Sequence, residues 1–103
     1  MIKNSKIIIN IPQDVQTILI GRDDPVSGIF PDINLEPYGA HEAGVGRRHV
    51  KLSLLDGGIF IEDLESVNGT FLNREKLYPK KAQPINNGDE LRLGKLVLIY
   101  QID

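Results

Sequence analysis

Apolar side chains recur at every second position in several short stretches of the chain. Ile7, Ile9 and Ile11 would lie on one face of a β-strand, and Ile18 and Ile20 repeat this spacing. An alternation with a period of two is typical of strands that bury one face. The same alternation recurs in the ranges 50–54, 59–64, 91–93 and 96–102. The pattern therefore predicts a fold built from β-strands.

Turn-forming residues separate these predicted strands at short intervals. Asp56-Gly57 and Asn68-Gly69 are dipeptides that favour tight turns between strands. Many short strands with frequent turns and no helical stretch are typical of an antiparallel β-sandwich. We therefore expect an all-β fold in which residues 1–103 form a single domain.

Two segments depart from simple alternation. Residues 96–102 are apolar on both faces, as expected for a strand that lies between two packed layers. Residues 23–46 contain prolines and glycines that interrupt any helix. Within this second segment, only residues 33–36 offer a short strand.

Composition and charge exclude several classes of protein. Twelve Lys and Arg against 14 Asp and Glu give a net charge of −2, which argues against non-specific nucleic-acid binding. The chain has no cysteine, which excludes disulfides and thiolate metal sites and fits a reducing compartment. The longest apolar run, 96–100, is far shorter than the ~20 residues that span a bilayer. No apolar stretch of signal-peptide length follows the N-terminus. We expect a cytoplasmic protein with no membrane or nucleic-acid partner.

Cationic and polar residues gather at three turns of the predicted sandwich. Arg47, Arg48 and His49 precede the predicted strand at 50–54, and Arg22 follows another strand. The range 66–70 is a turn rich in hydroxyl and amide groups. Loops at one end of a sandwich converge in space although they are distant in sequence. Guanidinium groups and a donor-rich turn that meet in this way would form a pocket for a phosphate group.

These motifs together resemble the forkhead-associated (FHA) domain family. Gly21-Arg22 is followed in the order and spacing of that family by the ranges 45–49, 63–73 and 88–94. Each motif is short, but four of them in the right order are specific. The resemblance implies a sandwich of about eleven strands that binds phosphothreonine proteins or peptides through its apical loops, without catalysis and without a cofactor.

The resemblance also implies which residues contact the ligand. Arg22 would bind the phosphate, and Arg47 would contact either the phosphate or the peptide. Asn68 would hold the backbone of the bound peptide, and Ser66 belongs to the same donor-rich turn. We expect all four to lie in the binding site.

Three further residues are expected to support the site without touching the ligand. His49 would clamp two loops together. Gly69 would supply the tight turn of the Asn-Gly dipeptide, because glycine accepts a positive φ without steric cost. Gly21 would satisfy a close-packing or backbone requirement.

The chain departs from the family at two positions of the expected pocket. Gly46 stands where the family usually has serine, and Val67 stands where it often has threonine. A hydrogen bond to a charged group contributes about 1.5–3 kcal/mol, so each lost hydroxyl could weaken binding by roughly 10- to 100-fold. We expect the backbone N–H of Gly46 to compensate in part by approaching the anion. Val67 would form a wall for the threonine methyl group.

Enzymatic and metal-binding functions find little support in the sequence. The chain has two histidines and no Gly-x-Ser-x-Gly motif of a serine hydrolase. His41-Glu42 and His49 do not have the spacing of a zinc-binding helix. The range 88–95 resembles a nucleotide-phosphate loop only superficially, because it is one residue too long and continues into Leu96. We expect neither catalysis nor a bound metal.

A second kind of function remains open at this point. Without the hydroxyls lost at Gly46 and Val67, the sandwich could serve as a phosphate-independent association or oligomerisation domain. The two hypotheses differ in whether binding depends on Arg22.

Overall fold

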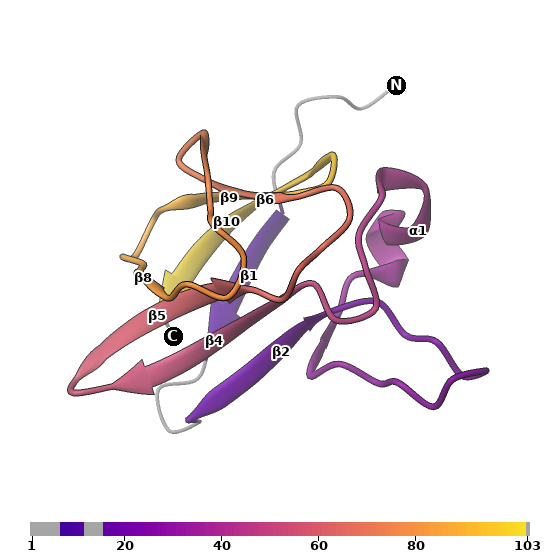
Figure 1. The fold of residues 1–103 in the computed structure, drawn as a ribbon, viewed down its shortest axis with the longest axis horizontal. Coiled ribbons are helices and arrows are strands. Elements are labelled where there is room, and N and C mark those ends of the chain that lie inside the picture. Colours follow the sequence, from indigo (N-terminus) through magenta and orange to yellow (C-terminus); the bar gives the residue numbers. More distant parts are fainter. Residues whose placement is uncertain (1–6, 12–15, 103) are drawn as a thin grey trace.

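Two five-stranded β-sheets hold nearly all of the regular structure in the computed structural model, which describes residues 7–11 and 16–102. The two sheets form two layers, and each is drawn as arrows in Figure 1. Sheet A has the strand order β1 (Ile7–Ile11), β10 (Leu96–Ile102), β9 (Glu90–Leu93), β6 (Thr70–Leu72) and β7 (Glu75–Lys76). Sheet B has the order β3 (Ile33–Asn34), β2 (Thr17–Gly21), β4 (Val50–Leu55), β5 (Gly58–Asp63) and β8 (Gln83–Pro84). The expected β-sandwich is confirmed.

Most strand pairs are antiparallel, as expected, but each sheet also contains one parallel pair. β1 pairs with β10 in parallel, and β2 pairs with β3 in parallel. Parallel neighbours need a long connection, which the chain between β1 and β10 and the loop between β2 and β3 provide. Alternation of apolar residues is the same in both pairing modes and does not distinguish them. The described residues contain ten strands and one isolated bridge, Asp24–Ile29, against about eleven strands expected.

Two single helical turns lie in the segment where the sequence predicted no helix. The 3₁₀-helix η1 spans Glu36–Tyr38, and the α-helix α1 spans Ala40–Ala43 (Figure 1). Gly39 and Gly44 flank α1, so the glycines shorten the helix to one turn without preventing it. No helix among the described residues is long and apolar enough to cross a membrane.

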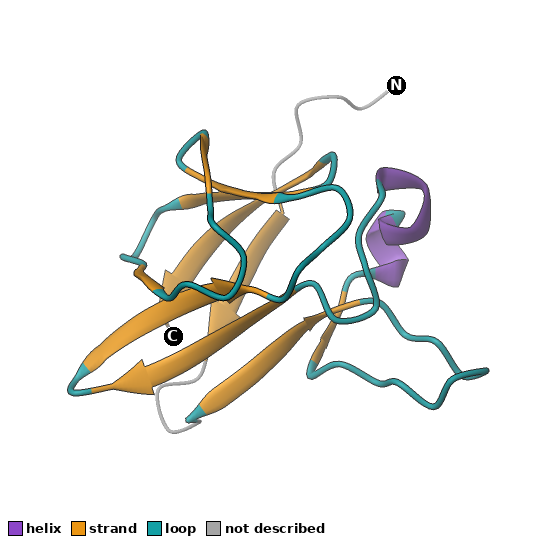
Figure 2. Ribbon diagram, in the orientation of Figure 1, coloured by secondary structure: helices purple, strands orange, loops and turns teal. Residues whose placement is uncertain are grey.

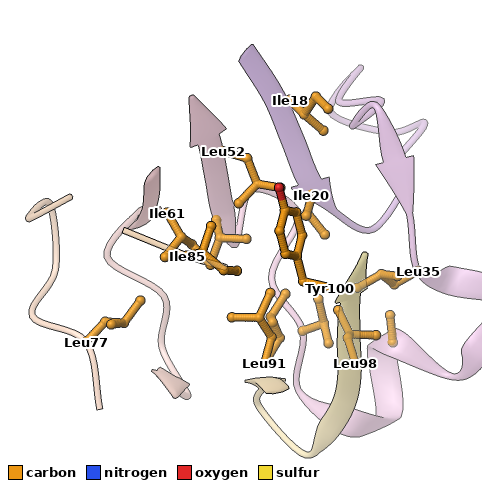
Figure 3. Close-up of a cluster of buried hydrophobic side chains, with 14 residues drawn as sticks. Ile18, Ile20, Leu35, Leu52, Ile61, Leu77, Ile85, Leu91, Leu98 and Tyr100 are labelled. Carbon is orange, nitrogen blue, oxygen red and sulfur yellow. The ribbon is translucent and has the colours of Figure 1, made fainter. Parts of the chain in front are cut away.

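The hydrophobic core lies between the two sheets (Figure 3). Sheet B contributes Ile20, Leu52 and Ile61, and sheet A contributes Leu98 and Tyr100. The other buried apolar residues are Ile18, Leu35, Ala40, Val45, Val50, Leu77, Ile85, Leu91 and Leu93. This core holds the ends of the strands, and therefore the loops between them, in fixed relative positions.

Strand β10 buries one face only, which corrects the expectation of a strand between two packed layers. Leu98 and Tyr100 point into the core, whereas Val97 and Ile99 on the opposite face are partly exposed. An apolar residue on the outer face of a sheet is common in soluble proteins, so an unbroken apolar run does not prove burial on both sides.

Candidate functional site

The strand register of sheet B brings three loops to one end of the molecule. Ile20 of β2 pairs with Val50 of β4, and Val50 pairs with Asp63 of β5, so the three residues form a row across the sheet. Because β4 is antiparallel to both neighbours, the chain leaves β2, enters β4 and leaves β5 on the same side of that row. Figure 2 shows these loops beside α1. They are residues 22–32, 44–49 and 64–69.

Gly21 allows two of these loops to pack closely. A Cβ atom at this position would lie 2.0 Å from the carbonyl oxygen of Arg47 and 2.8 Å from that of Gly46. Both distances are far inside van der Waals contact, so the backbone of Gly46 and Arg47 can approach the end of β2 only beside a glycine. The close approach places Arg47 next to Arg22, the residue that follows Gly21.

The side chain of His49 connects two of the loops by hydrogen bonds to their backbone. Its side chain is fully buried. The backbone N–H of Gly46 donates to Nδ1 at 2.9 Å, and Nε2 lies 2.9 Å from the carbonyl oxygen of Gly69. Because Nδ1 accepts a hydrogen bond, the ring is neutral and carries its proton on Nε2, which donates to Gly69. Burial lowers the pKa of His49 below its ordinary value of 6.5.

The same contact corrects the role expected for the backbone of Gly46. Its N–H donates to His49 instead of pointing at an anion. The imidazole is an acceptor three residues away in the same loop, at a distance of 2.9 Å from the Gly46 nitrogen. A Cβ atom at Gly46 would lie 3.7 Å from Nδ1 of His49, which is ordinary contact, so a larger residue fits at this position.

The turn between β5 and β6 is built on the buried carboxylate of Asp63. Oδ1 of Asp63 accepts hydrogen bonds from the hydroxyls of Ser66, at 2.5 Å, and Thr70, at 2.6 Å. Oδ2 accepts a further bond from the backbone N–H of Ser66 at 3.2 Å. The Ser66 hydroxyl in turn accepts from the N–H of Gly69 at 3.1 Å, and Gly69 has a φ of +86° that favours glycine. Ser66 therefore holds the shape of the turn.

Sequence reasoning missed Asp63 although the sequence carried a signal for it. In the alternating stretch 59–64, Asp63 falls on the same face as Ile59 and Ile61. Ile61 is buried in the core, and Asp63 is only 2% exposed. A carboxylate on the inward face of a strand needs internal donors, and the hydroxyls three and seven residues later supply them.

Val67 and Asn68 are adjacent in this turn but line different hollows. Val67 is 96% exposed and lines a pocket together with Arg22 and Arg47. Asn68 lines a neighbouring hollow instead, and its Nδ2 donates to the carbonyl oxygen of Gly44 at 2.9 Å. The structure therefore brings the arginines and Val67 together in one pocket and places Asn68 in a separate hollow.

The pocket has a volume of about 440 Å³ and opens at the end of the sandwich. It contains five residues that the sequence assigned to the binding site and three that it did not. The assigned residues are Arg22, Gly46, Arg47, Ser66 and Val67; the others are Ile29, Arg48 and Glu65. The presence of Arg48 raises the number of guanidinium groups around the pocket to three.

The two assigned arginines are held in different ways. Nε of Arg22 donates to the neutral carbonyl oxygen of Val45 at 2.9 Å. Nη1 of Arg47 forms an ion pair with Oδ2 of Asp24 at 3.0 Å and donates to the Ser27 hydroxyl at 3.2 Å. Arg22 thus keeps its charge uncompensated by this contact, whereas Arg47 shares its charge with a carboxylate.

These donors suit a small, highly charged oxyanion. Guanidinium groups form short, paired hydrogen bonds to phosphate oxygens, and a phosphate monoester carries about −1.5 to −2 charges at neutral pH.

Among the described residues, no group of three or more His, Cys, Asp or Glu side chains could hold a metal ion.

Comparison with known proteins assigns the chain to a protein family. The family model of the FHA domain matches residues 18–94 of the chain. The chain belongs to the FHA domain family. The matched range includes all three loops of the pocket and every residue that the sequence assigned to it.

Relatives and solved structures agree with this FHA assignment. The oxoglutarate dehydrogenase inhibitor of Corynebacterium glutamicum is 36% identical over 87 residues, which are 84% of this chain and 52% of that protein. The chain thus spans about half the length of this curated relative. The FHA domain of a hypothetical protein from Arabidopsis thaliana superposes with a TM-score of 0.61 and 31% identity, covering 82% of this chain and 68% of that one. A structure from work on phosphothreonine-dependent FHA domain interactions has a TM-score of 0.59 and 26% identity, covering 82% and 77%.

The neutral state of His49 predicts how the stability of this FHA domain depends on pH. Because the folded protein holds the pKa of His49 below 6.5, the unfolded chain binds more protons in the range just below that value. The free energy of unfolding should therefore be constant above pH 7 and fall as the pH drops below 6.5. Chemical denaturation of the wild type between pH 8 and pH 5 measures this slope.

Two variants assign the slope to its residue. His49→Asn should lower the free energy of unfolding at pH 7.5 by about 2 kcal/mol, because it breaks buried hydrogen bonds, and should flatten the slope. His41→Gln is the matched control, since His41 is the other histidine and is exposed; it should retain the wild-type slope. If the pH dependence of the free energy of unfolding were lost in His41→Gln and retained in His49→Asn, the assigned tautomer of His49 would be contradicted.

Proposed function

We propose that the chain is a non-catalytic binding module whose ligand is a phosphothreonine in a protein or peptide, recognised in the cytoplasm. We also propose that residues 1–103 form one FHA domain. The observation that carries the proposal is that residues from three loops, including Arg22 and Arg47, line one pocket. The related FHA structure from work on phosphothreonine-dependent interactions supports the same ligand.

In this proposal Arg22 is the main phosphate ligand. Its Nε is occupied by the carbonyl oxygen of Val45, which fixes the direction of the guanidinium and leaves the terminal amino groups for the ligand. Arg47 and Arg48 would approach the phosphate from the neighbouring loop. Ile29 and Val67 would provide the apolar surface for the threonine methyl group.

Asn68 would hold the peptide backbone from the separate hollow that it lines. Its Nδ2 is held by the carbonyl oxygen of Gly44, so the side-chain carbonyl oxygen has a set direction and can accept a hydrogen bond from a peptide N–H. Ser66 would contribute by holding the turn, because its hydroxyl already donates to Asp63.

The absence of catalysis is part of the proposal and rests on the state of the polar groups at the site. The imidazole of His49 is buried, with both nitrogens engaged by the backbone of Gly46 and Gly69. The hydroxyl of Ser66 donates to Asp63 rather than to a base that could activate it.

One observation favours the alternative of phosphate-independent association. The N–H of Gly46 donates to His49 and the hydroxyl of Ser66 donates to Asp63, so neither donor is free for a phosphate. Val67 exposes an apolar side chain in the pocket. A partner that buried Val67 would not need a phosphate group.

Replacing Arg22 separates the two functions. In titrations with matched phosphothreonine and unmodified peptides, the wild type should prefer the phosphorylated form, and Arg22→Ala should lose at least about 30-fold in affinity for it. Arg74→Ala is the matched control, because Arg74 is an exposed arginine on the turn between β6 and β7. Equal affinity of the wild type for both peptides, or an unchanged affinity in Arg22→Ala, would reject the phosphate-dependent role.

Restoring a hydroxyl at Gly46 tests the missing-donor argument. Gly46→Ser should strengthen phosphopeptide binding by about 10-fold, since one hydrogen bond to a charged group contributes about 1.5 kcal/mol or more. The position has room for the side chain. Gly46→Ala introduces the same Cβ without a donor and should bind as weakly as the wild type. If the serine and alanine variants bound equally, the hydroxyl argument would be wrong.

A further inference from the structure

A closed loop holds a carboxylate against one of the pocket arginines. Asp24 and Ile29 pair through two backbone hydrogen bonds, at 2.9 and 3.1 Å, and the tip between them folds back so that the Ser27 hydroxyl lies 2.6 Å from Oδ2 of Asp24. Nη1 of Arg47 donates to this same Oδ2 and to the Ser27 hydroxyl. The carboxylate is therefore fixed by its own loop before any ligand arrives.

This contact divides the cations of the pocket into two kinds. The hydrogen bond of Arg22 to the carbonyl oxygen of Val45 does not compensate the charge of Arg22, because the acceptor is neutral. Arg47 is half-exposed, at 48%, but carries a carboxylate at 3.0 Å. Hydrogen bonds from Ser27 and Arg47 hold the pKa of Asp24 below its ordinary value of 3.8, so the carboxylate is charged throughout the neutral range.

We propose that Asp24 is an internal competitor for Arg47, which lowers the affinity of the pocket for a phosphate group. The inference rests on the proposed phosphate-binding function and deepens it. A phosphate that binds Arg47 must either share the guanidinium with Asp24, which brings two anions close together, or break the ion pair between Arg47 and Asp24. Both reduce the free energy gained on binding. Fixed like charges of this kind weaken binding and make it selective.

The competition should depend on the charge of the ligand. A phosphate monoester gains its second negative charge around pH 6, so its repulsion by Asp24 is larger above that pH than below it. Arg47 is the cation that faces Asp24, and the other charged groups lining the pocket are Arg22, Arg48 and Glu65. A purely structural role of Asp24 would give no such dependence on ligand charge.

The experiment compares the wild type with Asp24→Asn, which keeps the shape and one acceptor oxygen but removes the charge. The probes are a phosphothreonine peptide, its unmodified form and inorganic phosphate, titrated at pH 7.5 and pH 5.0. Asp24→Asn should bind both phosphate probes about 5- to 20-fold more tightly at pH 7.5, with a smaller gain at pH 5.0. Thermal unfolding checks that each variant is folded.

Two further variants separate charge from local structure. Asp23→Asn removes the same charge from the neighbouring residue, which forms no ion pair with Arg47, and should change affinity by less than about 2-fold. Ser27→Ala removes the hydroxyl that links Asp24 and Arg47 but leaves the carboxylate, and its gain should be well below that of Asp24→Asn.

The outcomes distinguish this inference from the proposed function. Equal binding of the phosphorylated and unmodified peptides would reject the phosphopeptide function, while inorganic phosphate would still report on Asp24. The inference is overturned if Asp24→Asn binds inorganic phosphate no more tightly than the wild type. It is equally overturned if the gain is the same at both pH values.

Discussion

The arrangement of the binding end depends on two buried polar side chains that hold loop backbone in place. Asp63 accepts two hydrogen bonds from Ser66 in the turn that follows β5 and one from Thr70 at the start of β6. His49 accepts from one loop and donates to another. Loops cannot be fixed by apolar packing alone, because their backbone N–H and C=O groups need partners. In this domain the two side chains supply some of those partners from inside the core.

Much of the fold follows from local patterns in the sequence. The alternating stretches correspond to β1, β2, β4, β5, β9 and β10. The two-residue strands β7 and β8 are too short to show a period, and the parallel pairings of β1 and β3 depend on long-range contacts that alternation does not encode. The helical turn α1 lies between two glycines and could not be told from a loop.

The site was predictable to the extent that the motifs are local. The order of the motifs predicted that Arg22, Arg47 and the 66–70 turn approach one another, and both arginines line one pocket with Ser66 and Val67 of that turn, whereas Asn68 lines a separate hollow. The partners of the polar groups were not predictable. Gly46 donates to His49, and Arg47 pairs with a carboxylate 23 residues away, because both contacts depend on how the loops fold over one another.

The cationic side chains of the pocket also form contacts within the domain. Arg22 is oriented by a carbonyl oxygen, whereas Arg47 is partly neutralised by Asp24. Affinity in such a site is a difference between ligand contacts and the internal contacts that they replace. On this account, Asp24 weakens one of the cations of the pocket, which favours reversible binding.

The most direct test of the central claim is to map the amide shifts of the ¹⁵N-labelled protein during titration with a phosphothreonine peptide and its unmodified form. The account predicts phosphate-dependent shifts concentrated at Arg22 and in the ranges 46–49 and 65–69. Phosphate-dependent shifts centred elsewhere, for example on the outer face of sheet B around Lys51 and Glu62, would contradict it.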